Sequence, residues 1–348
     1  MSKFFNEYFL MGYNLNTILI AVCISMIVLL VFSIAKFWPI IAYSQFPYLP
    51  NQGEQHRKSS PLSEGNQGTT FNDTGLNDNK VAIITFGDAW KSQFTTAKPI
   101  LDKYGFKASF FIPCNYPDKK KTAMTWQDIA GLQNDGMDIQ SKGMNDILVT
   151  DLSPSALEFE VGQSKQCLLN HSVDAIAFAT PHGEGSNNAT VVNTIAKYYD
   201  LAINGFSNLM FLHCDGWKQN STQTDCRTFD DAGNVTYANK YVIREWSHNV
   251  RDRTYSHNDT KIFQIFVQEV NNQTKYNHNG VINAIPILAY HKIDNLGTNQ
   301  STNIALFDRE MKYLHDNGFR VITLSDLAYN ENNNSFYVKT IGKSQQPK

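Results

Sequence analysis

The chain has 348 residues, a formal net charge of -2 at pH 7 and an isoelectric point near 6.5. This length is enough for one large or two ordinary domains. The balanced charge, without a basic stripe, gives no electrostatic reason to expect nucleic-acid binding. Aromatic residues make up 12% of the chain, which is enough for a sizeable core.

An uncharged apolar segment follows a short polar and aromatic lead over residues 1–16. It covers residues 17–35, which is long enough to cross the hydrocarbon core of a bilayer. The next residues, Lys-Phe-Trp at 36–38, are typical of a membrane interface. A cleaved signal peptide ending near Ala35 is the alternative interpretation, but the apolar run is long for one. We therefore predict an uncleaved transmembrane anchor over 17–36.

Sequons for N-glycosylation all follow this segment. Together with the cysteines, they favour a single-pass protein of the cell membrane whose C-terminal domain is extracytoplasmic and is glycosylated if the cell does so. The sequons begin at Asn72, Asn170, Asn188, Asn220, Asn234, Asn258, Asn272, Asn299 and Asn333.

Residues 51–80 are polar and rich in Gly, Ser, Asn and Asp, which indicates a flexible tether; we place this tether at 37–79. Beyond them, apolar strand-like runs alternate with helical patterns, which predicts parallel βα units in a barrel or a doubly wound sheet. We place this folded domain at 80–330 and a C-terminal tail at 331–348. The expected strands are 81–86, 108–113, 137–141, 175–179, 200–203, 241–245, 284–290 and 320–324; the expected helices are 92–103, 126–135, 153–170, 189–198, 261–274 and 304–317.

Four cysteines lie after the apolar segment, and none belongs to a CxxC pair, so a zinc cluster is not expected. An even number favours disulfides in an oxidising compartment. Cys214 and Cys226 close a short polar loop and are the favoured pair. Cys114 and Cys167 would form the second pair, with free buried thiols as the alternative for them.

The stretch TFGDAWKSQFTTAKPILDKYGFKASFFI, residues 85–112, resembles the opening of the NodB-like polysaccharide deacetylases. In that family the first strand ends in Thr-Phe-Asp-Asp-Gly. The resemblance covers residues 80 to about 328 and implies a deformed (β/α) barrel. The segment IPILAYHKI and the helical pattern after it resemble a part that many relatives carry before this strand, so the chain looks circularly permuted.

The resemblance also implies a reaction, the hydrolytic removal of acetyl groups from the amino sugars of a polysaccharide or glycan. In the family, the first aspartate is the general base, and the second binds a divalent metal such as zinc with two histidines. A later histidine protonates the leaving amine. A backbone N–H helps to hold the oxyanion.

This sequence keeps only part of that pattern. Asp88 stands at the position of the metal-binding aspartate, but Gly87 stands at that of the base. Lys142 and Asp146 fall where the family has its two metal-binding histidines, and His291 stands at the position of the general acid. We therefore expect the ordinary metal-dependent mechanism to be impaired and a bound metal only if an altered site survives.

The remaining motifs predict the walls of a substrate cleft. Pro181 and His182 belong to a retained Pro-x-Gly turn, with His182 as a second catalytic candidate. Arg244 and Trp246 follow a strand where the family has an aromatic-lined wall. The competing interpretations are structural: the histidines as hydrogen-bonded wall residues, Trp246 and Trp90 as core, and Arg244 with Glu245 as an ion pair.

Two interpretations of the centre remain open. Lys142 could lie between Asp88 and Asp146 and replace the metal cation, or Lys142 and Asp146 could belong to a solvated loop. Asp88 could also cap the following helix. A metal site with changed geometry could instead use the side chains Asp88, Asp146, His182, His248 and His291.

Three functions follow from these alternatives. The first is a membrane-anchored polysaccharide deacetylase with an altered site and impaired activity. The second is a catalytically inactive relative that binds a glycan in the same place. The third is a scaffold protein of the cell envelope.

Overall fold

The computed structural model describes residues 79–213, 240–247, 258–298 and 300–339. The predicted anchor at 17–36, nearly all of the tether and the pair Cys214 and Cys226 lie outside these ranges. His248 also lies outside them. Within the ranges, no helix combines the length and the apolar character needed to span a membrane.

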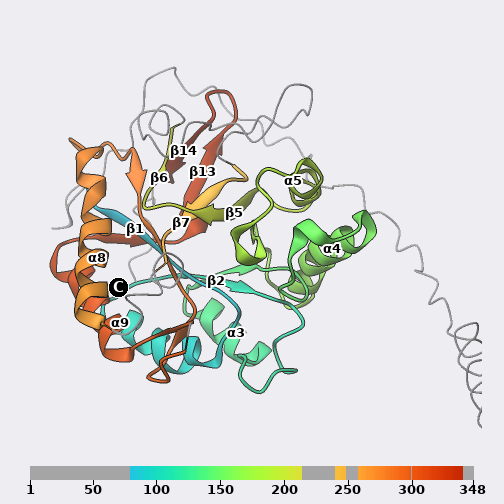
Figure 1. Cartoon of the computed structure of the whole chain (residues 1–348), viewed down its shortest axis with the longest axis horizontal. Coiled ribbons are helices and arrows are strands. Elements are labelled where there is room, and N and C mark those ends of the chain that lie inside the picture. The colour runs from blue at the N-terminus through green and yellow to red at the C-terminus, as the bar shows by residue number, and fades with distance from the viewer. Residues whose placement is uncertain (1–78, 214–239, 248–257, 299, 340–348) are drawn as a thin grey trace, which may run out of the picture. The chain divides into compact units, whose positions relative to one another are not determined.

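A parallel β-barrel forms the centre of the domain (Figure 1). β1 (Val81–Phe86), β2 (Ser109–Ile112), β3 (Asp138–Ser141), β4 (Ala177–Ala179), β5 (Leu201–Phe206) and β7 (Ile243–Glu245) pair in this order, all in parallel. β9 (Ile287–Tyr290) pairs with the other edge of β1. Trp246, directly after β7, forms a parallel bridge with Leu288 of β9, and this contact closes the seven strands into a barrel.

The C-terminal part of the chain therefore completes the barrel, as the resemblance implied. β12 (Arg320–Ile322) pairs in parallel with the start of β1, on the edge opposite to β9 and next to the position of β2. The deformed (β/α) barrel predicted from the sequence is confirmed.

Helices flank the barrel. A π-helical turn, η1 (Gln93–Ala97), leads into α2 (Lys98–Lys103), and α3 (Trp126–Asn134), α4 (Pro154–Asn170), α5 (Ala189–Ala196), α8 (Asp259–Asn272) and α9 (Ile304–Asp316) follow along the chain. In Figure 1, α8 and α9 lie together on one side, and α4 and α5 on the opposite side. Several of these helices begin at side chains that accept hydrogen bonds from their first turn, as Thr125 and Ser153 do.

Alternation along the strands divides the apolar side chains between two cores. Ala82 and Ile84 belong to the larger core, which also contains the buried faces of the helices. Val81 and Ile83 belong to a second core built from strand residues and from the C-terminal segment. Because successive strand residues point to opposite faces, the second core fills the barrel and the first lies between sheet and helices.

The structure corrects the end of the folded domain. β13 (Leu327–Asn330) and β14 (Ser335–Val338) form an antiparallel hairpin, and Phe336 is 1% exposed in the inner core. The fold thus continues beyond residue 330, where we had placed the start of the tail. The sequence pattern did not predict this hairpin, because its second strand follows a run of asparagines, a composition typical of a loop.

Two further short strand pairs and a break in one predicted strand complete the fold. The strand predicted at 284–290 is divided at Pro286 into β8 (Ala284–Ile285) and β9, because proline has no N–H to continue a ladder. β8 pairs antiparallel with β6 (Met210–Phe211), and β10 (Lys292–Ile293) pairs with β11 (Ser301–Thr302). The other predicted strands and helices are present, with ends shifted by a few residues.

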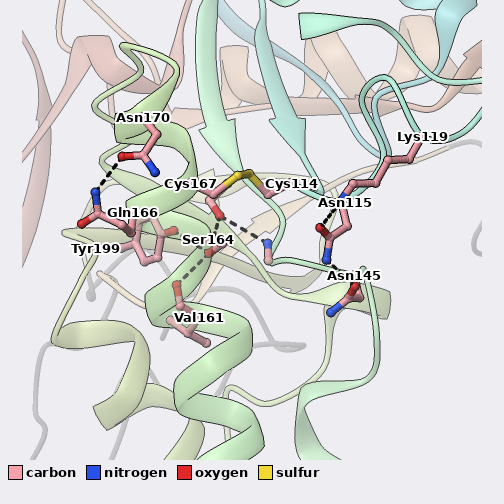
Figure 2. Close-up of a disulfide and its surroundings, with 12 residues drawn as sticks. Cys114, Asn115, Lys119, Asn145, Val161, Ser164, Gln166, Cys167, Asn170 and Tyr199 are labelled. Atoms are coloured by element: carbon pink, nitrogen blue, oxygen red, sulfur yellow. Dashed lines mark hydrogen bonds between the residues drawn. A yellow bond between two sulfur atoms is a disulfide. The ribbon is translucent and has the colours of Figure 1, made fainter. Parts of the chain in front are cut away.

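A disulfide joins Cys114, just after β2, to Cys167 on α4, with their Cα atoms 6.4 Å apart (Figure 2). This confirms the second of the two pairs considered from the sequence and excludes free thiols for these two residues. The favoured pair, Cys214 with Cys226, stays a prediction.

Candidate functional site

The candidate site lies at one end of the barrel, where the strands β9, β1 and β3 end; β2 lies between β1 and β3. Asp88 follows β1, Lys142 follows β3 and His291 follows β9. Because the strands are parallel, their carboxyl ends meet at the same rim of the barrel. Residues that are 54 and 203 positions apart in the chain therefore come into contact.

Lys142 lies between two carboxylates. Its Nζ donates a hydrogen bond to Oδ1 of Asp88 and lies 3.3 Å from Oδ1 of Asp146. The side chains of Lys142, Asp88 and Asp146 are 11%, 4% and 19% exposed, so water screens these ion pairs little. The geometry of the predicted cation replacement is confirmed. Asp88 is not the helix cap, since its side chain is directed to Lys142.

The second oxygen of Asp88 is bound as well. Oδ2 lies 2.7 Å from Nδ1 of His291 and accepts a hydrogen bond from Nε1 of Trp90 at 3.2 Å. Each oxygen of this buried carboxylate thus has a partner that is a donor or a cation. The arrangement holds Asp88 as an anion.

Burial and charge act in opposite directions on these groups. Burial alone would raise the pKa of Asp88, but Lys142 and His291 outweigh it and hold that pKa well below its ordinary value. Burial alone would lower the pKa of Lys142, but Asp88 and Asp146 outweigh it and raise that pKa. Burial raises the pKa of Asp146, although Lys142 opposes the shift. Asp88 and Lys142 are therefore both charged at neutral pH.

Gly87 leaves the space that Lys142 and His291 use. A Cβ atom added to Gly87 would lie 3.2 Å from Nζ of Lys142 and 3.3 Å from Nδ1 of His291. Both separations are tighter than most contacts of a real Cβ atom. The residue that removes the family's base is thus also the residue that lets the lysine and the histidine approach Asp88 from both sides.

The backbone around Asp88 is held in an uncommon conformation. Asp88 and Ala89 have φ angles of 73° and 55°, in the left-handed region that residues with a Cβ rarely adopt. Gln93, which is buried at the start of η1, helps to fix this turn: its Nε2 donates to the carbonyl oxygens of Gly87 and His291, the latter at 3.0 Å. Such strain persists only where the surroundings determine the conformation.

A second set of contacts holds the loop that carries Lys142 and Asp146. Cys114 N–H donates to Gly143 C=O at 2.9 Å, and the disulfide ties Cys114 to α4. Glu160, also on α4, accepts from the backbone N–H and from Nδ2 of Asn145, at 2.5 and 2.8 Å. Helix α4 therefore positions the loop through a covalent bond and a carboxylate.

Glu245 is a site residue that the sequence analysis had considered only as a partner for Arg244. Its Oε2 accepts a hydrogen bond from Oγ1 of Thr85 at 3.0 Å, inside the rim below Gly87. Burial raises the pKa of Glu245, while His291 and Lys142 oppose this. The signal was available: a Glu that alternates with an apolar strand residue, Ile243, has to face the barrel interior.

The remaining predicted residues do not all join this cluster. His182 is exposed, at φ 60° in the turn after buried Pro181, and its charge would lower the pKa of Asp146. Arg244 lies on the face of β7 opposite to Glu245, where burial lowers its pKa. Trp246 is buried in the outer core, 6.4 Å from the ring of Phe266 between centroids, and so does not offer its face to a sugar.

The described residues do not fit the divalent metal that the resemblance implies. Both oxygens of Asp88 are already engaged, and the nitrogen between the two carboxylates is an ammonium, which has no lone pair to give and repels a cation. The loss of both histidines leaves Asp146 as the other carboxylate ligand candidate. Among the residues that the structure describes, no group of three or more His, Cys, Asp or Glu side chains is arranged to hold a metal.

Comparisons with known proteins agree with the resemblance. The sequence profile of the family described as polysaccharide deacetylase matches residues 74–201. Comparison with curated proteins gives no match. The motif residues discussed above up to the Pro181 turn all lie inside the matched range.

Solved structures of deacetylases and esterases are also similar. A Streptococcus pyogenes deacetylase in complex with acetate is 25% identical, with 36% of this chain and 56% of that chain covered and a TM-score of 0.35. A family 4 carbohydrate esterase from Streptomyces lividans, also with acetate, is 14% identical, with coverages of 75% and 98% and a TM-score of 0.42. A family 4 pseudoenzyme is 13% identical, with coverages of 71% and 66% and a TM-score of 0.42.

The aligned part of the chain thus spans about half of the streptococcal enzyme. The profile match covers residues 74–201, and over this range, within the barrel described above, the chain is similar to the polysaccharide deacetylases.

Proposed function

We propose that this protein is a membrane-anchored, extracytoplasmic relative of the polysaccharide deacetylases that binds an N-acetylated glycan at the carboxyl end of its barrel and hydrolyses it poorly. The observation that carries the proposal is the ion pair between Lys142 and Asp88. The lysine charge lies where the family would use a metal ion. Gly87 leaves the base position without a side chain that could accept a proton.

Hydrolysis of an acetamide requires an activated water and a stabilised oxyanion. Loss of a positioned base alone typically slows such a reaction about a hundredfold to ten-thousandfold. His291 remains at the rim with Asp88 on its Nδ1, so it can still hold or donate a proton. Binding is expected to survive these losses, because the barrel and its rim are intact.

The location is supported by two features. Residues 17–36 have the composition of a membrane anchor, and the bond between Cys114 and Cys167 is of a kind that persists in oxidising compartments. Glycopeptide mass spectrometry of the sequon at Asn188 tests the orientation where the cell glycosylates. A glycan on Asn188 is expected, and a purely cytosolic location of this domain in protease-protection experiments would contradict the proposal.

The function is tested with the full-length protein in detergent and N-acetylglucosamine oligosaccharides. We expect measurable binding in calorimetry and an acetate release at least a hundredfold below that of an active family member, unchanged by added Zn²⁺. Rapid acetate release that depends on the metal would show an ordinary deacetylase. Absence of both binding and release would favour the scaffold alternative.

A further inference from the structure

Four lysines beside the site form no ion pair with a carboxylate of the described residues. Lys119, Lys120 and Lys121 are consecutive exposed residues between β2 and α3, and Lys292 follows His291. We call these four residues the lysine rim. Many other lysines in the described ranges do pair with carboxylates: Lys98, Lys103, Lys165, Lys197, Lys240 and Lys312.

The lysine rim adjoins the site through Trp90. Nε1 of Trp90 donates to Asp88, and Trp90 forms an antiparallel bridge with Ala123, just after the three lysines. Next to this bridge, Lys91 N–H donates to Thr122 C=O at 2.8 Å. The loop that carries Lys119–Lys121 therefore lies alongside the turn that carries Asp88.

Neutral groups hold three of the four ammonium groups of the rim, those of Lys119, Lys120 and Lys292. Nζ of Lys292 lies 4.1 Å from the centre of the Trp90 ring, and Nζ of Lys120 lies over the Tyr116 ring. Nζ of Lys119 donates to Oδ1 of Asn115 at 2.6 Å (Figure 2). Aromatic faces and an amide can orient a cation, but they do not neutralise it. These lysines are thus fixed while their charge stays available to a ligand.

Nearby acidic residues compensate the rim only in part. Asp128 forms an ion pair with Lys91 at 2.5 Å, so its negative charge is already balanced by that lysine. Asp118 precedes the three lysines, and Asp294 follows Lys292 at two residues and accepts from Leu296 N–H at 2.9 Å. Four lysines against these two carboxylates leave this side of the site with an excess of positive charge.

We propose that the glycan bound here is acidic, and that the lysine rim binds anionic groups spaced along the sugar chain while the acetamido sugar lies at Asp88 and Lys142. This inference rests on the proposed function and names the chemical class of its ligand. Carboxylates of uronic acids and phosphate esters share the required chemistry. The overall charge of -2 does not oppose this, because recognition depends on the local field.

The test compares oligosaccharides that share N-acetylglucosamine and differ in charge. Calorimetry on the full-length protein in detergent measures the affinity for chitohexaose, for a hyaluronan hexasaccharide and for an N-acetylglucosamine 1-phosphate oligomer of equal length. We expect at least one acidic oligomer to bind about tenfold more tightly than chitohexaose, since two to three exposed ion pairs contribute this much. The difference should shrink when NaCl is raised from about 0.05 to 0.5 M.

A double variant, Lys121→Gln with Lys292→Gln, should remove most of the preference and leave chitohexaose binding unchanged. Its matched control is Lys275→Gln with Lys339→Gln, which removes the same charge from exposed lysines that also have no carboxylate partner among the described residues but hydrogen-bond to Asn272 and Ser325.

The possible outcomes of these binding measurements distinguish the inference about acidic ligands from the proposed glycan binding. Equal affinity for neutral and acidic oligomers would overturn the inference and leave the proposed glycan binding in place. An acidic preference that the control double variant loses equally would also overturn it, since the effect would then come from net charge. Failure to bind any of the three oligomers would overturn the proposed function itself.

Discussion

Replacement of Lys142 by methionine tests whether its ammonium is the cation of this site. Lys142→Met keeps the length of the side chain but leaves Asp88, which is 4% exposed, without its main partner. At an effective dielectric constant of 20, a unit charge 3.3 Å away, as between Lys142 and Asp146, interacts by about 5 kcal/mol before desolvation is subtracted. Removal of one member of a buried pair costs about 3–5 kcal/mol. For Lys142→Met we expect a loss of about 3 kcal/mol in the free energy of unfolding, at the lower end of this range, because His291 still contacts Asp88 at 2.7 Å.

The pH dependence of this cost follows from the two pKa shifts. The pKa of Asp88 is depressed, so its stabilisation is present above the unfolded value near 3.8 and is lost as pH falls through the folded value. The pKa of Lys142 is raised, so its stabilisation is present below its unfolded value near 10.5 and is lost as pH rises through the folded value. The cost of Lys142→Met should therefore be largest between about pH 5 and 10 and shrink mainly below about pH 4.

Urea unfolding of the full-length protein in detergent at about pH 3, 7 and 9 provides the measurement. The control is the double variant Asp88→Asn with Lys142→Met, which removes both charges and should recover most of the lost free energy of unfolding. A cost below about 1 kcal/mol at pH 7, or a double variant as unstable as the single one, would refute the view that these charges depend on each other.

Other predictions concern the same rim. Gly87→Ala should lower the free energy of unfolding by about 1–3 kcal/mol in chemical denaturation. The double variant with Lys142→Ala should be less destabilised than the sum of the two single variants, because the shorter side chain makes room for the new Cβ atom. Cys114→Ser should cost about 2–4 kcal/mol, and reduction of the wild-type bond to Cys167 should cost the same; a much smaller loss would show that the loop is held without the bond. The triple change Gly87→Asp, Lys142→His and Asp146→His should create a Zn²⁺ site detectable by calorimetry, whereas Gly87→Asp alone should not, because the ammonium remains; Zn²⁺ binding by that single variant would contradict the proposed exclusion.

Much of the fold was predictable because its signals are local. The apolar runs at β1 and β2 and the helix starts at Thr125 and Ser153 follow from periodicity and capping alone. The position of Pro286 within the strand predicted at 284–290 also indicates a break. The hairpin of β13 and β14 was not predictable in this way, since it is stabilised by the burial of Phe336 against distant strands.

The part of the candidate site formed by Asp88, Lys142 and Asp146 was predictable, because each of these residues follows a strand of the predicted barrel. Lys142 and Asp146 are four residues apart and follow β3, which is separated from the strand of Asp88 by β2 alone. The parallel barrel is therefore enough to bring the three side chains to the same rim. Alternation along the strand predicts that Glu245 faces the barrel interior, but its partner, the hydroxyl of Thr85, belongs to another strand and could not be derived. The role of Gln93 could not be derived either, because it depends on the carbonyl oxygen of the distant His291. For Trp246 the sequence left two interpretations, because an aromatic residue after a strand can line a substrate cleft or belong to the core. The packing of the structure places it in the outer core.

The missing Cβ of Gly87 has a consequence for how this site can change over generations. A carboxylate cannot return at position 87 without crowding Lys142 and His291, and Lys142 cannot be lost first without leaving Asp88 as an unpaired buried anion. Each single step back toward a metal site therefore passes through a protein that is less stable than its parent. A substitution at residue 87 or 142 alone is thus unfavourable. We expect descendants of this protein either to replace both residues together or to keep both.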